Sequence, residues 1–225
     1  MLCNRCSQRT DEGNWIPLTR PRYPAAMATC ISVIGPAMGQ TNALNQAISV
    51  ALKDDSVRQV IYLGEDNAAH VVVEQLLADG LTPTNFLTRA VDVAVGGSDQ
   101  QIRQLLNDEA CGRRLAAVRC LPKPPARAIE LLDRWILLAV HDKAVLDEDD
   151  IANAQVILYG KSDTPMLKRF GQRYFFSPGP LSGGHIGALE LKNDGSLVLA
   201  LKDLAGNVEQ KETLLSGASK LTVTA

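Results

Sequence analysis

The sequence predicts an α/β fold in which two mixed β-sheets pack face to face with helices outside, a four-layer α/β/β/α sandwich. In the first half, strand-like and helix-like segments alternate, which is typical of parallel strands joined by right-handed crossovers. In the second half, strand-like segments come in pairs separated by short turns, which is typical of hairpins. The 225 residues are 46% hydrophobic and 21% charged, so the chain can bury a large core without disulfides.

Residues 1–27 differ from the rest. They are polar, contain Pro17, Pro21 and Pro24, and show no apolar periodicity. We expect a flexible leader over residues 1–27 and a single domain over residues 28–225. Within the leader, Cys3 and Cys6 form one C-x-x-C without a second pair of ligands, so two free thiols are favoured over a zinc site.

Two β-α units open the predicted domain. Residues 31–34 and 57–63 are short, β-branched segments that predict buried strands. A helix follows each of them, over residues 41–53 and 68–79, and Gly80 ends the second helix. The first helix has one apolar face, made of Ala43, Leu44, Ala47, Ile48, Ala51 and Leu52.

Two more strands are expected before the hairpins. Apolar residues alternate over residues 91–95, and residues 115–120 form another short apolar run. Between them, Ser98 and Gln101 have the spacing of a capping box. The helix that this box begins carries Ile102, Leu105 and Leu106.

Hairpins and single strands account for the second half. The third hairpin has an Asn-Asp-Gly turn. The expected segments are 128–132 with 135–140, then 156–159, 166–170 with 173–176, 186–191 with 197–201, and 207–214.

Composition excludes several classes of function. The formal net charge is -2, the pI is about 5.9, and Lys and Arg are scattered, so we expect no nucleic-acid partner. No run of about 18 apolar residues is present, so we expect no membrane span. Five cysteines without a preceding apolar signal segment indicate a reducing, cytoplasmic setting.

Several strand ends carry motif-like segments. Residues 31–44 align with a strand followed by D-x-H-G-N-x-x-A-L. Residues 60–67 align with a strand ending in L-G-D, and residues 116–121 align with a strand ending in V-x-G-N-x-D. Trp135 to Asp142 matches I-L-L-T-H-G, and Val156 to Pro165 matches V-I-Y-G-H-T-H-x-P, continuing into F-x-N-P-G-S at residues 174–181. In this order and spacing the chain resembles the calcineurin-like metallophosphoesterases, especially their small bacterial phosphodiesterases.

The resemblance implies where a two-metal site stood in an ancestor. That family holds two metal ions with Asp, His and Asn side chains, and a bridging hydroxide attacks the phosphate. The resemblance places these ligand positions on Pro36, Met38, Glu65, Leu121, His141, Lys161 and Asp163. Pro, Met, Leu and Lys are unsuitable ligands for hard divalent cations.

The resemblance therefore implies a non-catalytic protein, a pseudoenzyme with the metallophosphoesterase fold that acts as a binding or scaffolding module, as the retromer subunit with this fold does. It implies no cofactor and a protein partner, and it leaves self-association open. Two alternatives stay open. One is a phosphodiesterase with a rearranged site that uses Mn²⁺ or another divalent metal through Glu65, Asp66, His141 and Asp163; the other is a nucleotide or small-ligand sensor in the old cleft.

Two further expectations concern this site. Without metals, the ammonium of Lys161 is expected within salt-bridge distance of Glu65 or Asp163, as a replacement for the lost positive charge. Residues 91–99 also resemble the L-G-D strand, with Asp99 displaced, but Glu65 is preferred because one helix separates it from the Gly39 loop. Residues 66–115 then contain an additional β-α insertion.

The other chemically notable residues have structural interpretations. Cys120 lacks an adjacent activating group, and residues 178–187 form a glycine-rich loop without a following helix. His70 lies in a helix and His185 in a turn, so neither is expected to bind a metal. The acidic residues 147–150 are interpreted as the start of a solvated helix.

Overall fold

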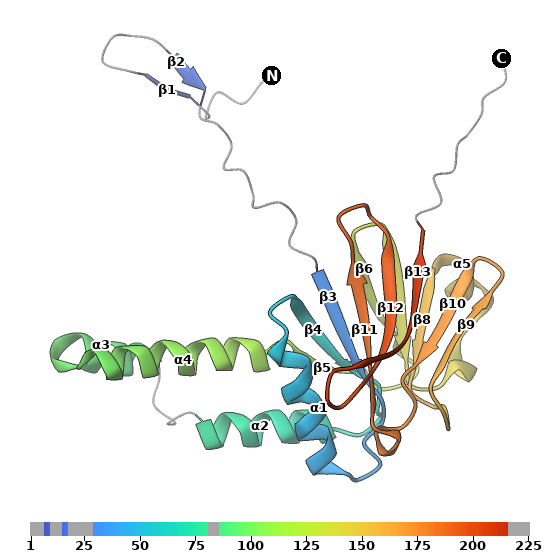
Figure 1. Cartoon of the computed structure of the whole chain (residues 1–225), viewed down its shortest axis with the longest axis horizontal. Helices are drawn as coiled ribbons and strands as arrows, with labels where there is room; N and C mark the ends of the chain where they lie inside the picture. The colour runs from blue at the N-terminus through green and yellow to red at the C-terminus, as the bar shows by residue number, and fades with distance from the viewer. Residues whose placement is uncertain (1–6, 10–14, 18–28, 81–85, 216–225) are drawn as a thin grey trace.

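Six strands form the first of two mixed sheets (Figure 1). This computed structural model describes residues 7–9, 15–17, 29–80 and 86–215. The strand order is β13-β12-β11-β3-β4-β5; β3, β4 and β5 are parallel, and the other neighbours are antiparallel. The bounds are β3 Thr29–Ile34, β4 Val57–Tyr62, β5 Val118–Cys120, β11 His185–Leu191, β12 Leu197–Asp203 and β13 Val208–Leu214.

Five strands form the second sheet, in the order β6-β7-β8-β10-β9. Its central strands β7, β8 and β10 are parallel, and β6 and β9 add to them as antiparallel hairpin partners. Each sheet therefore contains three neighbouring parallel strands, whose carboxyl ends lie together at one edge of the sheet. The bounds are β6 Ala128–Leu132, β7 Trp135–Val140, β8 Val156–Tyr159, β9 Met166–Phe170 and β10 Arg173–Ser177.

The main core lies between the two sheets. Val33 and Ile61 of the first sheet belong to the same buried cluster as Leu158 and Phe176 of the second. Gly187 of β11 is required there, because a Cβ atom on it would lie 2.5 Å from the ring of Phe176. The predicted face-to-face packing of two mixed sheets is confirmed.

Helices cover both outer faces. Helices α1, Thr41–Lys53, and α2, Ala68–Gly80, pack on the six-stranded sheet through a second buried cluster that includes Leu44, Ile48 and Val72. Helix α5, Glu148–Asn153, packs on the five-stranded sheet near Leu138 and Ile157. Short 3₁₀ turns lie at Lys143–Val145 (η1) and Leu181–Gly183 (η2). The predicted four layers and the predicted bounds of α1 are confirmed.

The segment between α2 and β5 differs from the prediction. Residues 91–95 are helical, inside α3, Phe86–Gly96. The prediction of a strand was wrong because two periodicities coincide there: Val91, Val93 and Val95 alternate, but Leu87, Val91 and Val95 also recur every four residues. The insertion therefore consists of two helices, and the predicted four-strand β-α alternation is reduced to three parallel strands.

Helix α4, Asp99–Leu115, follows α3 after the predicted capping box. The Ser98 hydroxyl oxygen accepts from the backbone N–H of Gln101, and the Gln101 side chain accepts from the N–H of Ser98. The helix continues through Leu115, so the expected strand over residues 115–120 is shortened to β5.

Two short strands lie within the predicted leader. β1, Ser7–Arg9, pairs antiparallel with β2, Trp15–Pro17, and the polar composition did not predict them. Cys3, Cys6 and the rest of residues 1–27 lie outside the described residues, so a flexible leader and a domain boundary at residue 27 stay predictions. In the described part of the chain, no helix combines the length and the apolar character that crossing a bilayer requires.

Candidate functional site

The carboxyl ends of the parallel strands carry the residues that the sequence singled out. Met38 follows β3, Glu65 follows β4, His141 follows β7, and Lys161 follows β8. Backbone hydrogen bonds join these loops: the N–H of Lys161 donates to the carbonyl of His141 at 2.7 Å, and the N–H of Leu181 donates to that of Pro36 at 2.9 Å. We call this region the strand-end edge.

Close backbone contacts between the two sheets define the shape of the strand-end edge. A Cβ atom on Gly35 would lie 1.8 Å from the carbonyl oxygen of Gly179, and one on Gly160 would lie 2.2 Å from that of Leu63. Gly179 also has a φ of +74°, which favours glycine. These glycines let loops from opposite sheets approach to backbone contact.

His141 makes a hydrogen bond between the sheets. Its Nδ1 atom lies 2.8 Å from the carbonyl oxygen of Leu63. Because a carbonyl oxygen only accepts, Nδ1 carries the proton and donates it. His141 therefore satisfies a backbone carbonyl of the opposite sheet.

The ammonium of Lys161 has a different partner from the two that were expected. Its Nζ atom lies 2.5 Å from Oδ2 of Asp142, and no ion pair joins it to Glu65 or Asp163. The reason is the register of β7 on β8, which pairs Val140 with Tyr159. Asp142 and Lys161, each two positions further along, therefore lie side by side. The expectation of Glu65 or Asp163 as the partner was wrong.

This ion pair stabilises the charged form of both groups. The Lys161 ammonium holds the pKa of Asp142 below its usual range, aided by the backbone N–H of Ala144, which donates to Asp142 at 2.9 Å. The hydrogen bond to Asp142 in turn raises the pKa of Lys161, and the nearby charge of Glu65 raises it slightly more. At neutral pH the pair is fully ionised, so Asp142 is already neutralised by a side chain of the protein.

Tyr62, which the sequence analysis did not single out, organises the loop after β4. Its hydroxyl donates to Oδ1 of Asp66 at 2.7 Å and accepts from the backbone N–H of Ala37 at 2.9 Å. The side chain is fully buried, and burial raises the pKa of its phenol well above the usual range. Asp66 is therefore hydrogen-bonded to a buried side chain of the core. A polar aromatic residue directly before the L-G-D-like segment was the only sequence signal for this role.

The residues at the strand-end edge do not fit a two-metal site. Pro36 offers no side-chain donor, the Met38 thioether points outward with 72% of the residue exposed, and Lys161 contributes a cation. Among the residues that the structure describes, no group of three or more His, Cys, Asp or Glu side chains lies close enough to hold a metal ion. Glu65 and Asp163 are exposed, and no ion pair joins either of them to another described residue.

Leu121 packs against the core between the two sheets. It follows β5 and lines a cavity of about 330 Å³ between the outer strands of the two sheets, β5 and β6. Gln59 and Glu130 also line this cavity and hydrogen-bond to each other at 2.7 Å. A larger, mostly apolar cavity of about 430 Å³ lies between α1, α2 and α4.

The remaining candidates have structural roles. His70 is exposed on α2 and faces Glu74 at 3.1 Å, and His185 lies 2.9 Å from Glu209 at the start of β11. Asp147 caps α5 by accepting from the N–H of Asp150 at 2.8 Å, which confirms the interpretation of the acidic run as a helix start. Burial raises the pKa of the Cys120 thiol, which disfavours the nucleophilic thiolate.

Comparison with known proteins gives matches in structure alone. No protein-family model and no curated protein matches the chain. A conserved uncharacterized protein from Streptococcus pneumoniae TIGR4, described as a predicted phosphoesterase, superposes with a TM-score of 0.51 at 13% identity, over 83% of this chain and 97% of that one.

Two further structures superpose less closely. Yfce, a phosphoesterase from E. coli, gives a TM-score of 0.47 at 15% identity over 83% of this chain and its whole length. Vacuolar Protein Sorting 29 from Cryptosporidium parvum gives 0.47 at 12% identity over 84% of this chain and its whole length. The first match, together with the two mixed sheets and flanking helices, shows a shared fold. The chain therefore has the fold of the calcineurin-like metallophosphoesterase superfamily, as its strand-end motifs indicate.

Proposed function

We propose that this protein is a non-catalytic metallophosphoesterase-fold protein that works as a binding or scaffolding module. The observation that carries the proposal is the ion pair between Lys161 and Asp142 at the strand-end edge, 2.5 Å long. A protein ammonium there supplies positive charge that a divalent cation would otherwise bring. It also repels any cation that approaches the neighbouring carboxylates.

The pattern of retained and replaced residues supports the same proposal. Residues that hold the two sheets together keep the family's types, as His141, Gly160 and Gly179 do. At the positions that the resemblance assigns to ligands, Pro36, Met38 and Lys161 are unable to coordinate a hard cation. Retention of structural residues alongside loss of ligands is what a fold kept for binding would require.

A hydrolysis assay tests the proposal against the phosphodiesterase alternative. The full chain is incubated with a chromogenic phosphodiester and Mn²⁺, beside a His141→Ala variant and a metal-free control. We expect no metal-dependent hydrolysis above the buffer rate for either protein. Hydrolysis that rises with Mn²⁺ and is lost in His141→Ala would establish a rearranged active site and end the proposal.

A thermal-shift assay tests the sensor alternative. A ligand that binds the folded state raises the melting temperature in a concentration-dependent way. We expect no such rise with nucleoside mono-, di- or triphosphates. A saturable rise would assign the protein to nucleotide sensing instead. A cytoplasmic location is part of the proposal and would be tested by fractionating cells.

A further inference from the structure

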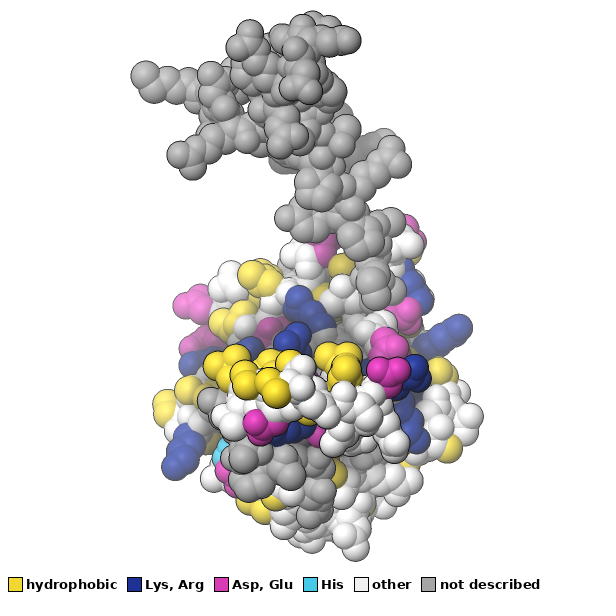
Figure 2. Space-filling view, turned by 90° about the vertical axis from the view of Figure 1, so that its left-hand side faces the viewer, with side chains coloured by type: hydrophobic (Ala, Val, Ile, Leu, Met, Phe, Trp, Pro, Cys, Tyr) yellow, Lys and Arg dark blue, Asp and Glu magenta, His cyan; other side chains and the backbone are white. Residues whose placement is uncertain are grey.

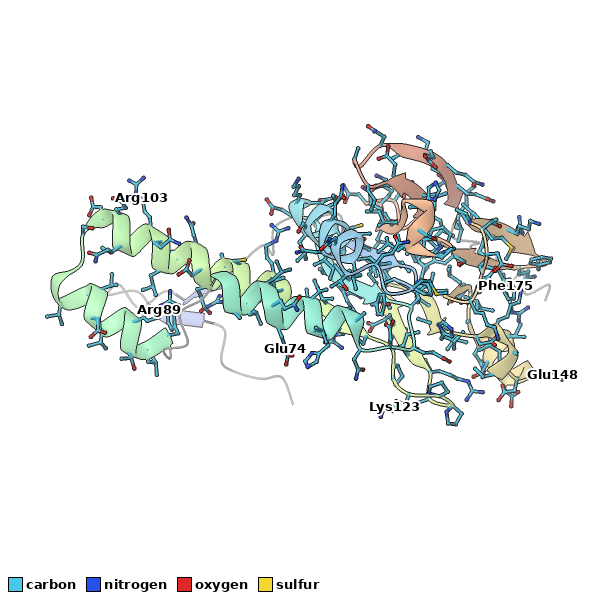
Figure 3. The ribbon with its side chains drawn as sticks, turned by 90° about the horizontal axis from the view of Figure 1, so that it is seen from below. Glu74, Arg89, Arg103, Lys123, Glu148 and Phe175 are labelled. Atoms are coloured by element: carbon cyan, nitrogen blue, oxygen red, sulfur yellow. The ribbon has the colours of Figure 1, made fainter. Side chains whose placement is uncertain are left out.

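Helices α3 and α4 form a two-helix arm that extends from the sheets (Figures 1 and 3). Arg89 of α3 lies between the helices, and its Nη2 atom is 2.6 Å from Oδ2 of Asp108 on α4, with both side chains largely buried (Figure 3). Gln104 donates to the other carboxylate oxygen of Asp108 at 2.7 Å. This ion pair holds α3 against α4 in one register, and Val91 lies two residues after Arg89 along α3.

One face of the arm is apolar and exposed. No residue of α3 is fully buried, and Leu87, Val91 and Val95, spaced four residues apart along one side, are 68%, 60% and 84% exposed. Ile102 and Leu106 of α4 are also exposed. Figure 2, which views the molecule from the side on which the arm projects, shows hydrophobic side chains gathered across the projecting helices.

The charge of the arm restricts the partner. Residues 86–115 contain four Arg and four acidic residues, so the arm has no net charge. Three of the Arg residues are already in ion pairs, with Asp108, Glu109 and Asp55. A polyanion or an anionic bilayer is recognised through excess positive charge, so neither nucleic acid nor a membrane surface fits this face. An apolar protein surface does.

We propose that the arm is a homodimerisation surface, on which α3 and α4 of a second copy pack antiparallel to complete a four-helix bundle. A two-fold axis through Val91 pairs Val91 with itself and Leu87 with Val95 of the other copy, because both lie four residues from Val91. The same axis passes α4 near the segment that carries Ile102 and Leu106. The apolar pattern is therefore self-complementary, as an isologous interface requires.

The available area suits a weak dimer. A fully exposed aliphatic side chain contributes roughly 60–120 Å² of apolar area. The exposed aliphatic residues of the arm, together with Phe86, therefore contribute about 700 Å² of apolar area from two copies. Since about 56–65% of an interface is apolar, the whole contact buries about 1,100–1,250 Å², near the lower limit of specific interfaces. The dimer should therefore dissociate in the micromolar range.

Sedimentation velocity on the full chain over rising concentration tests this inference. We expect a monomer–dimer equilibrium with a Kd of about 1–100 µM. Val91→Asp should weaken the dimer at least about 10-fold, because it places two carboxylates against each other at the axis. Val71→Asp is the matched control, since Val71 is a half-exposed valine on α2, away from the arm, and it should leave the equilibrium unchanged.

Circular dichroism is the check on folding, and we expect both variants to be folded because the substitutions are at exposed positions. A chain that stays monomeric up to about 1 mM overturns the inference and leaves this face to residues 1–28 or to a different protein. A dimer that withstands Val91→Asp overturns it as well, because another surface then forms the contact. The inference goes beyond the proposed function and is independent of it, since the arm is separate from the strand-end edge and the readout is mass.

Discussion

The Nδ1 atom of His141 lies 2.8 Å from the carbonyl oxygen of Leu63, so a side chain at the end of β7 in one sheet satisfies the backbone at the end of β4 in the other. In the family that the motifs resemble, a histidine of this segment serves a metal site. Here its proton-bearing nitrogen is committed to holding the two sheets together.

Replacing His141 should therefore reduce stability. His141→Ala leaves a sheltered carbonyl without its donor, which costs about 1–3 kcal/mol of unfolding free energy in urea titrations. His141→Asn, whose amide can donate from a similar position, should recover part of the loss. The control His70→Ala removes an exposed histidine on α2 and should change stability by less than about 0.5 kcal/mol. Equal effects at positions 70 and 141 would contradict the structural role of His141.

The ion pair of Lys161 and Asp142 should add little to stability despite its short distance. Lys161 is 66% exposed, and exposed pairs contribute about 0–1 kcal/mol. A double-mutant cycle with Lys161→Met and Asp142→Asn should give a coupling energy in that range. The parallel cycle with Lys161→Met and Glu65→Gln should give a coupling near zero. A larger coupling with Glu65 than with Asp142 would mean that the partner is misassigned.

Gly35 should be intolerant of any side chain. Gly35→Ala forces a methyl group against the carbonyl oxygen of Gly179, a backbone atom that cannot rotate away, and should cost about 2–3 kcal/mol by denaturant titration. Gly96→Ala is the control, because a Cβ there meets nothing within 4 Å at the end of α3. That change should be neutral or slightly stabilising. A tolerated Gly35→Ala would show that the two loops are further apart than described.

The fold was largely predictable from sequence where a single periodicity applied. In α1, apolar residues such as Leu44 and Ile48 fit only a helix, so both ends were predicted correctly. At Val91 the strand and helix periods coincide, and only the absence of a neighbouring strand decides between them. The partner of Lys161 depends on the register of β7 on β8, and the role of Tyr62 depends on three-dimensional proximity, so neither was accessible from spacing.

Stability should fall in acid. Asp203 accepts from the side chain of Asn207 at 2.8 Å, and Asp194 accepts from the hydroxyl of Ser196 at 2.6 Å; these bonds hold the pKa of each carboxyl below its usual range. Because the folded pKa is below the unfolded value of about 3.9, this stabilisation is complete above about pH 4 and is lost as the pH falls through the folded pKa.

Urea midpoints measured from neutral pH down to about pH 3 test this. Asp203→Ala should be less stable at neutral pH and should lose less on acidification than the unaltered chain. Parallel pH profiles for the two proteins would show that Asp203 has no part in the acid sensitivity.

The central claim, that the strand-end edge has exchanged metal ions for a protein cation, is tested most directly by isothermal titration calorimetry of the full chain with Mn²⁺. We expect no saturable binding with a Kd below about 100 µM, and the same heat for the unaltered chain and for the variant His141→Ala/Glu65→Gln. Saturable binding of one or two Mn²⁺ ions per chain that disappears in this double variant would contradict the account.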